Sequence, residues 1–252
     1  MKVVVAGGSG FIGRALVGSL AADGHDVVVV SRKPGTAAGP RGVAWDGVPG
    51  EVDGAGAVVN LAGVSIGGPR WTARRREAIR ASRVETTRSL AEAIAASADP
   101  PRVFVTASGI DYYGDRGEEI VDEASSPGRS FLAGVCVEWE AAAAASPARH
   151  VAVRTAVVLG PGSRTVKLMA LPFMLFVGGP LGSGQQWFPW VHLDDLVTIY
   201  RLAIEDESLA GPVNAVAPEQ LRQREVARAF GSVLHRPSFV PTPAVVLRAA
   251  LG

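Results

Sequence analysis

A glycine-rich turn near the N-terminus constrains the fold of this chain more than any other feature. Residues 2–6 (KVVVA) form a valine-rich run typical of a buried strand, and a helical pattern begins at about Phe11. Between them, Gly7, Gly10 and Gly13 stand three residues apart. Glycines in this context allow a tight turn, a close backbone approach to a pyrophosphate and close packing of helix on sheet. The strand–turn–helix pattern therefore predicts a dinucleotide-binding unit.

The start of the following helix supplies the second half of such a site. The first N–H groups of a helix have no acceptor within it, and the helix dipole adds partial positive charge at that end. Both features favour a bound phosphate. We therefore expect the cofactor contacts of this turn to come from Gly7, Gly10, Phe11, Ile12 and Gly13.

Strand-like and helix-like segments alternate along the first 160 residues, a pattern typical of βαβ units on a parallel sheet. The predicted strands are 2–6, 26–30, 57–61, 102–106 and 150–154, with a weak one near 43–45. The predicted helices are 11–22, 72–97, 131–145, 165–177, 193–205, 222–234 and 243–251. We expect an α/β fold: a Rossmann-type doubly wound parallel sheet in residues 1–160, and a small C-terminal substrate cap in residues 161–252, interleaved with the last sheet elements.

Composition excludes several classes of protein. A formal net charge of +1 offers no broad positive field for nucleic acid. The longest apolar stretch, 169–177, is too short to cross a membrane and contains Pro172. Cys136 alone rules out a disulfide framework, and the four histidines lack metal-ligand spacing. These counts lead us to expect no metal site. Since a strand directly follows Met1, we also expect no signal peptide and a cytoplasmic protein. The oligomeric state stays open.

The end of the second predicted strand indicates which dinucleotide binds. NAD sites usually place a carboxylate there for the ribose 2′-hydroxyl. This chain has Ser31, Arg32 and Lys33 instead. A hydroxyl and a guanidinium suit a 2′-phosphate, so we predict NADP(H), with Ser31 and Arg32 among its ligands. The alternative is that these side chains belong to a solvated loop.

Further strings along the chain carry a resemblance to a known family. They are residues 31–34 (SRKP), 60–63 (NLAG), 70–71 (RW), 82–87 (SRVETT), 108–114 (SGIDYYG), 139–140 (WE) and 189–196 (PWVHLDDL). With the glycine turn, they resemble the extended short-chain dehydrogenase/reductase superfamily and its atypical epimerase-family branch, described as nucleoside-diphosphate-sugar epimerase-like. The resemblance covers essentially the whole chain.

The resemblance implies a Rossmann-type NADP domain, a small cap and a small polar substrate, of which a sugar nucleotide is the family example. It places Leu61, Ala62 and Gly63 beside the cofactor. Arg83 stands where the family has an asparagine, and either reaches cofactor phosphate or ribose from its helix or belongs to a charged surface. Family members usually continue beyond the length of this chain, which leaves the completeness of the C-terminus open.

The lysine content tests the family mechanism. That mechanism uses a tyrosine whose pKa, normally about 10, is lowered by a lysine four residues later. Only three of the 25 basic residues are lysines, and no tyrosine stands four residues before any of them. The pattern aligns Leu132 and Cys136 with the two positions. The usual proton-transfer pair is therefore absent, and the standard mechanism cannot be carried over.

Ser108 is the family catalytic residue that remains, although it is one residue out of register. Tyr112 and Tyr113 follow it, near the C-terminal end of a predicted strand, where α/β sheets bind ligands. We expect Ser108 to polarise a substrate oxygen; either tyrosine could donate a proton, or both could be pocket walls. The sequence predicts an NADP(H)-binding, epimerase-family oxidoreductase acting on an unidentified small polar substrate. The alternative is a non-catalytic, NADP(H)-responsive sensor or scaffold protein.

Overall fold

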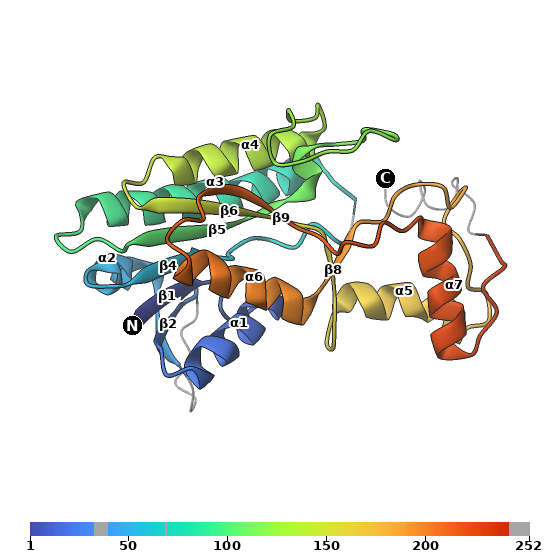
Figure 1. Ribbon diagram of the computed structural model, residues 1–252, viewed down its shortest axis with the longest axis horizontal. Helices are drawn as coiled ribbons and strands as arrows, with labels where there is room; N and C mark the ends of the chain where they lie inside the picture. Colours follow the sequence, from blue (N-terminus) through green and yellow to red (C-terminus); the bar gives the residue numbers. More distant parts are fainter. Residues whose placement is uncertain (33–39, 69, 242–252) are drawn as a thin grey trace. The chain divides into compact units, whose positions relative to one another are not determined.

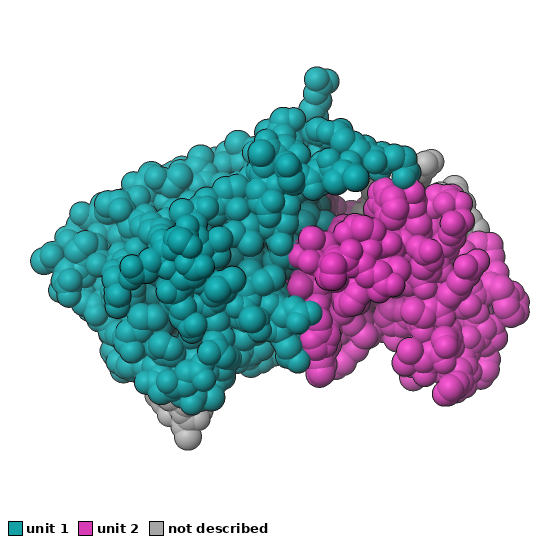
Figure 2. Space-filling view, in the orientation of Figure 1, with its two compact units in different colours: residues 1–64, 77–155, 194–215 teal, residues 65–76, 156–193, 216–252 magenta. Residues whose placement is uncertain are grey.

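The computed structural model describes residues 1–32, 40–68 and 70–241. The chain divides into two compact units, coloured separately in Figure 2. Unit 1 comprises residues 1–64, 77–155 and 194–215, and unit 2 comprises residues 65–76, 156–193 and 216–252. One passage between the units, at residue 155, lies close to the boundary expected at residue 160. The chain also passes between them at residues 64, 76, 193 and 215.

Unit 1 is built on a seven-stranded sheet in the order β3-β2-β1-β4-β5-β6-β9. Its strands are β1 (Lys2–Ala6), β2 (Asp26–Val30), β3 (Arg41–Val43), β4 (Ala57–Asn60), β5 (Val103–Gly109), β6 (Arg149–Thr155) and β9 (Gly211–Ala215). Every neighbouring pair is parallel. The strand order runs outward from β1 in both directions, so β1 and β4 form the switch point at which such sheets bind ligands. The predicted Rossmann-type α/β fold is confirmed.

Helices cover both faces of this sheet (Figure 1). They are α1 (Phe11–Ala22), α2 (Val48–Val52), α3 (Ala73–Ala96), α4 (Phe131–Ala144) and α6 (Leu193–Glu205), with short 3₁₀ turns at Trp45–Gly47 and Ile110–Tyr112. On one face, an ion pair of 2.7 Å between Arg201 and Asp23 joins α6 to the end of α1. On the other, a 2.7 Å ion pair between Arg80 and Glu138 joins α3 to α4.

The core of unit 1 lies between the sheet and these helices. Val3, Val4 and Val5 of β1 are completely buried, because a parallel sheet covered on both faces leaves no side of a central strand in water. Leu16 on α1 and Leu90 on α3 are equally buried on the two opposite helical layers. Burial stabilises each such side chain by about 1.5–3 kcal/mol. This packing holds the C-terminal ends of β1, β4 and β5 in place.

Unit 2 contains none of the seven-stranded sheet. Its elements are β7 (Val157–Leu159), β8 (Trp190–His192), α5 (Arg164–Met174) and α7 (Gln223–Leu234). The two short strands pair in parallel, and Phe173 of α5 stacks on Phe230 of α7 with ring centroids 5.7 Å apart. The helix predicted for residues 243–251 lies outside the described residues. No helix within the described ranges has the length and apolar content that crossing a bilayer requires.

Candidate cofactor site and active site

The glycine turn is packed backbone against backbone. Gly7 has a φ of 78°, a conformation in which a side chain would be strained. A Cβ atom on it would lie only 2.7 Å from the backbone of Leu61 and Ala62. A Cβ atom on Gly13 would overlap the carbonyl oxygen of Gly7. These glycines therefore let the turn contact the loop after β4, and let α1 pack on the turn.

The N-terminus of α1 is suited to an anion. Gly10 is its N-cap residue, so no side chain caps the helix, and its first turn contains no acidic residue. The N–H groups of residues 11–13 are therefore left for another acceptor. Arg14 brings a cation to the same turn by donating from Nη1 to the Ser9 carbonyl oxygen over 2.7 Å. The residues present fit the pyrophosphate of a dinucleotide.

The end of β2 carries the predicted 2′-phosphate ligands. The Ser31 N–H donates to the Val43 carbonyl oxygen over 3.0 Å, which fixes the backbone just beyond β2. Arg32 is exposed, and no hydrogen bond or ion pair joins it to the part of the chain that the structure describes. Lys33 lies outside those residues. A guanidinium with no partner among the described residues fits a negatively charged ligand group.

A buried asparagine shapes the loop after β4. The Asn60 side chain is completely buried, and its Nδ2 donates to Thr87 Oγ1 on α3 over 2.8 Å. Its Oδ1 accepts from the Ala62 N–H over 3.0 Å. Trp139 on α4 donates to the same Thr87 oxygen, also over 2.8 Å. These bonds hold residues 61–63 between the glycine turn and α3.

Arg83 lies directly against this loop. A Cβ atom on Gly63 would lie 3.3 Å from Arg83 Cζ, so the guanidinium contacts the backbone there. Nη1 donates to the carbonyl oxygens of Val64 and Ile79, each over 3.0 Å, and Cζ lies 5.3 Å from the Trp139 ring centroid. Burial lowers the Arg83 pKa, although nearby acidic groups offset part of that effect. This placement puts Arg83 beside the predicted cofactor loop rather than on an open surface.

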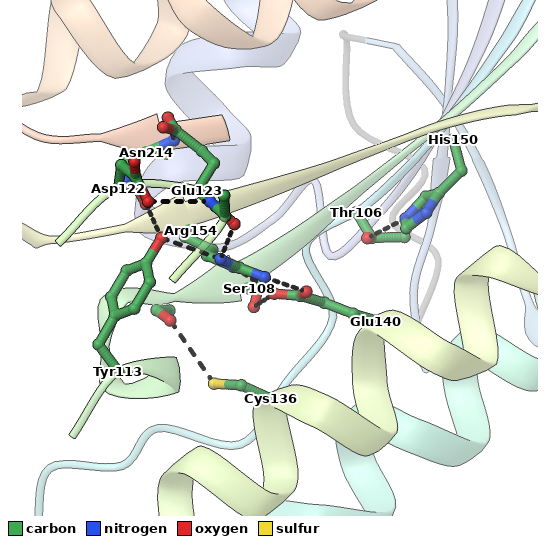
Figure 3. A network of polar contacts seen from close by, with 12 residues as sticks. Thr106, Ser108, Tyr113, Asp122, Glu123, Cys136, Glu140, His150, Arg154 and Asn214 are labelled. Atoms are coloured by element: carbon green, nitrogen blue, oxygen red, sulfur yellow. Dashed lines mark hydrogen bonds and ion pairs between the residues drawn. The ribbon is translucent and has the colours of Figure 1, made fainter. Parts of the chain in front are cut away.

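The predicted catalytic residues meet at Arg154, a residue of β6 that is only 3% exposed. Its guanidinium makes two hydrogen bonds to Glu140, from Nε over 2.9 Å and from Nη2 over 2.8 Å. Ser108 Oγ donates to the same carboxylate over 2.6 Å. Burial alone would lower the Arg154 pKa, but its hydrogen bonds to Glu140 and Tyr113 outweigh burial and raise it. Figure 3 shows Arg154 between Tyr113 and Glu140.

The two tyrosines contact the same guanidinium. Tyr113 is buried; its hydroxyl donates to Asn214 Oδ1 over 2.7 Å and accepts from Arg154 Nη1 over 2.9 Å. Burial raises the Tyr113 pKa, and Arg154 offsets only part of that rise. Tyr112 stacks differently, with Arg154 Cζ 3.5 Å from its ring centroid. The pKa of Tyr113 therefore moves away from the value that proton transfer by a tyrosine needs.

The residues aligned with the usual tyrosine and lysine lie on α4. Leu132 lies in its first turn, and Cys136 is buried one turn later. The Cys136 thiol donates to the Gly109 carbonyl oxygen over 3.7 Å. Burial raises the Cys136 pKa to about 11, so the thiol holds its proton at neutral pH. Neither side chain can perform the role of the family pair.

Three residues of the site were missed by sequence analysis: Arg154, Asp111 and the Tyr113 acceptor Asn214. Arg154 stands at the end of a valine-rich strand, and one charge there was the available signal. Asp111 follows β5 in the 3₁₀ turn and lies within the family string 108–114, but nothing in that string assigned it a role. The Asp111 side chain is exposed, yet the surrounding protein removes enough water to raise its pKa, an effect that Arg83 partly opposes. Groups of three or more metal-ligating side chains are absent from the described ranges.

Comparisons with known proteins agree with this geometry. The model of the NAD dependent epimerase/dehydratase family matches residues 3–215. Epimerase family protein SDR39U1 of Bos taurus is 43% identical over 264 residues, covering 100% of this chain and 87% of its own.

Two solved structures are also similar. The crystal structure of human epimerase family protein SDR39U1 (isoform 2) with NADPH has a TM-score of 0.93 at 41% identity, covering 100% of this chain and 86% of its own. The nucleoside-diphosphate sugar epimerase of Corynebacterium glutamicum has a TM-score of 0.78 at 34% identity, covering 100% of this chain and 55% of its own. The predicted resemblance is confirmed, and the chain belongs to the NAD dependent epimerase/dehydratase family.

Proposed function

We propose that this chain is an NADP(H)-dependent oxidoreductase with epimerase-like chemistry that acts on a small polar substrate. One observation carries the cofactor assignment: an uncapped α1 N-terminus stands beside a β2 end that bears the exposed Arg32 and no carboxylate. The human relative solved with NADPH supports the same assignment. A hydride donor or acceptor is the chemistry that this cofactor supplies when bound.

Each part of the site has a distinct task in this proposal. The first-turn amides of α1 hold the pyrophosphate, and Ser31 and Arg32 hold the 2′-phosphate. Residues 61–63 line the cofactor, with Arg83 behind Gly63. Ser108 polarises a substrate oxygen after exchanging its hydrogen bond to Glu140 for one to the substrate. The hydrogen bonds of Tyr113 to Arg154 and Asn214 favour a role for it as a fixed wall of the site.

The substrate class rests on a relative. The C. glutamicum protein, 34% identical to this chain, is named a nucleoside-diphosphate sugar epimerase. A sugar nucleotide is therefore the first substrate to test. A ring hydroxyl flanked by polar groups also suits a site that contains Ser108, Arg83 and Asp111.

A second candidate function is a non-catalytic, NADP(H)-responsive sensor or scaffold. The observation that favours it is the loss of both members of the usual proton-transfer pair, replaced by Leu132 and a thiol that stays protonated. In that case NADPH would bind and change the conformation or partners of the protein without being consumed. The two candidates share a cofactor site and differ only in turnover.

Fluorescence titration with NADPH and NADH tests the cofactor. We expect NADPH to bind more tightly, and Arg32→Ala to remove most of that preference, because the guanidinium contacts only the 2′-phosphate. Arg88→Ala is the matched control, since Arg88 is exposed on α3 and makes no hydrogen bond or ion pair with the described part of the chain. Equal affinities for the two cofactors would refute NADP(H) selectivity.

Turnover separates enzyme from sensor. A panel of sugar nucleotides and simpler carbonyl compounds, followed by nicotinamide absorbance, should contain at least one substrate whose reduction is lost in Ser108→Ala. NADPH binding without turnover across the panel would favour the sensor. Sugar nucleotides should also be analysed for a change of configuration, because epimerisation returns the cofactor to its starting state and leaves absorbance unchanged.

A further inference from the structure

The polar groups at the end of β5 divide into those that bind one another and those that are free. Ser108, Glu140, Arg154 and Tyr113 are joined in one network of hydrogen bonds. Asp111 belongs to the other kind. Its carboxylate accepts a hydrogen bond from its own backbone N–H, and no ion pair or side-chain hydrogen bond links it to another residue of the described ranges.

Arg83 is also only partly used. Its Nη1 donates twice to backbone carbonyl groups, whereas Nε and Nη2 make no hydrogen bond with the described part of the chain. A guanidinium has five N–H donors, so three remain for a ligand. Because Gly63 has no side chain, its backbone comes close to this guanidinium. Arg83 therefore has unused donors next to the predicted cofactor loop.

Asp111 and Cys136 both lie next to Gly109, the residue that ends β5. A Cβ atom on Gly109 would lie 3.4 Å from Asp111 Oδ2 and 3.7 Å from Cys136 Sγ. Cys136 occupies the position of the missing lysine. The Asp111 carboxylate thus lies near the point that the tyrosine–lysine pair would serve, although it comes from the 3₁₀ turn instead of from α4.

We propose that Asp111 is the proton-transfer group of this site and that the free donors of Arg83 hold the reacting oxygen of a secondary alcohol or its ketone. This inference rests on the proposed function. When the alcohol is oxidised, its O–H proton passes to Asp111. The hydrogen on the carbinol carbon leaves with both electrons of the C–H bond, as hydride, to a nicotinamide cofactor. The O–H bonding pair becomes the second bond of the carbonyl group. Reduction reverses each transfer.

The electrostatic surroundings support this role. The surrounding protein raises the Asp111 pKa, which brings it closer to neutral pH, where proton transfer is most efficient. The backbone hydrogen bond of Asp111 and the positive charge of Arg83 on α3 oppose this rise and favour the ionised carboxylate. The negative charges of Asp111 and Glu140 both raise the pKa of Cys136 on α4. The Cys136 thiol is therefore a reporter of the charge on Asp111.

Titration of Asp111 in the full-length chain tests the pair without a substrate. Carbon-detected NMR of the aspartate carboxyl groups, assigned with Asp111→Asn, should give a pKa above the ordinary aspartate value. Arg83→Gln should raise that pKa further, because a cation that favours the carboxylate is lost. Arg88→Gln on the same helix should leave it unchanged. An Asp111 pKa at the ordinary aspartate value, or one that is the same in the wild type and in Arg83→Gln, would overturn the proposal.

The single cysteine gives a second test that needs no turnover. Asp111→Asn removes a negative charge that raises the Cys136 pKa, so the thiolate fraction and the iodoacetamide alkylation rate should rise, by at least about twofold. Circular dichroism must show that the variant is folded. An unchanged rate in a folded variant would place Asp111 too far away and overturn the proposal.

Kinetics then tests proton transfer itself. With any substrate that the wild-type chain turns over, Asp111→Asn should lower kcat by about 100-fold or more while leaving the NADPH Kd unchanged. Asp111→Glu should restore part of the rate and shift its pH profile. Wild-type kcat in Asp111→Asn would overturn the proposal. A wild-type chain that binds NADPH and turns over no substrate would instead overturn the proposed function. The titration and the alkylation rates would still show whether Asp111 interacts with Arg83 and lies near Cys136.

Discussion

The glycine turn and the end of β5 offer two different ways of building a site in one sheet. The turn at residues 7–13 works through the absence of side chains, and all of its essential positions lie within one short segment. The end of β5 works through side chains brought together from β5, α4, β6 and β9, such as Ser108, Glu140, Arg154 and Asn214. The turn therefore depends on the spacing of glycines within one segment, whereas the site at β5 depends on residues that only the folded chain brings together.

The largest effect that this comparison predicts comes from Arg154. Arg154→Met should lower the free energy of unfolding by about 3–5 kcal/mol, because it leaves the Glu140 carboxylate, whose side chain is only 16% exposed, without its cation. Urea denaturation measures the change. Arg102→Met is the control, since the Arg102–Glu207 pair is more than 70% exposed and such pairs contribute little. Equal losses in the two variants would show that the β5 network does not stabilise the fold.

A double variant sharpens the same point. Arg154→Met combined with Glu140→Leu removes both charges, and much of the lost stability should return because no unpaired charge stays buried. Ser108 would also lose the acceptor for its hydroxyl group. If the double variant is no more stable than Arg154→Met alone, the loss comes from packing around Tyr112 and Tyr113 and not from the buried carboxylate.

The same contrast explains how much could be predicted from sequence. Strands β1, β2, β4 and β6 and helix α1 were predicted within a residue, because buried valine runs and a glycine cap are local signals, whereas β5 continues three residues beyond its predicted end. Strand β9 was missed because it begins Gly211–Pro212, a pair that argues against a strand and is tolerated at the edge of the sheet. Strands β7 and β8 have only three residues each, too few to show a period.

The site followed the same division. The positions of the glycine turn could be assigned from spacing alone, since one segment contains them. The partners of Tyr113 could not, because Arg154 and Asn214 lie 41 and 101 residues further along the chain, respectively, and meet it only through strand order. Asp111 lies within the string 108–114, which assigned it no role, and its place beside Gly109 and Cys136 is seen only in the folded chain.

A second prediction places pH sensitivity on the β5–β6 side of the molecule. Burial lowers the His150 pKa to about 4, so the folded chain keeps a neutral ring while the unfolded chain takes up a proton below about 6.5. The unfolded state then binds more protons between these values, and stability falls as the pH drops from 7 to 4. The loss is up to about 3 kcal/mol. Urea denaturation across this range should show a smaller pH dependence in His150→Gln; an identical dependence would contradict the prediction.

The glycine turn provides a third prediction. Gly13→Ala should cost about 1–3 kcal/mol of stability, because its methyl group would overlap the Gly7 carbonyl oxygen and push α1 away from the turn. NADPH affinity should fall about tenfold or more as the first-turn amides move. Gly18→Ala on the same helix is the matched control: no atom lies within 4 Å of the added Cβ, so that variant should gain about 0.5–1 kcal/mol. Thermal unfolding and NADPH titration measure both; a Gly13→Ala variant with intact affinity would show that the turn does not bind phosphate.

The smallest predicted effect compares two helix N-termini. The Ser130 hydroxyl oxygen caps α4 by accepting from the Ala133 N–H over 3.0 Å, whereas α1 has no side-chain cap. Ser130→Ala should therefore cost about 1 kcal/mol, with or without NADPH, since α4 has its own cap. The α1 terminus should gain its acceptor only from the cofactor, so NADPH at about 100 times its Kd should stabilise wild type and Ser130→Ala alike, by about 2.7 kcal/mol. Calorimetry with and without NADPH tests both statements. A smaller NADPH effect in Ser130→Ala would mean that the cofactor phosphates are held by α4 as well, and that the two regions do not bind independently.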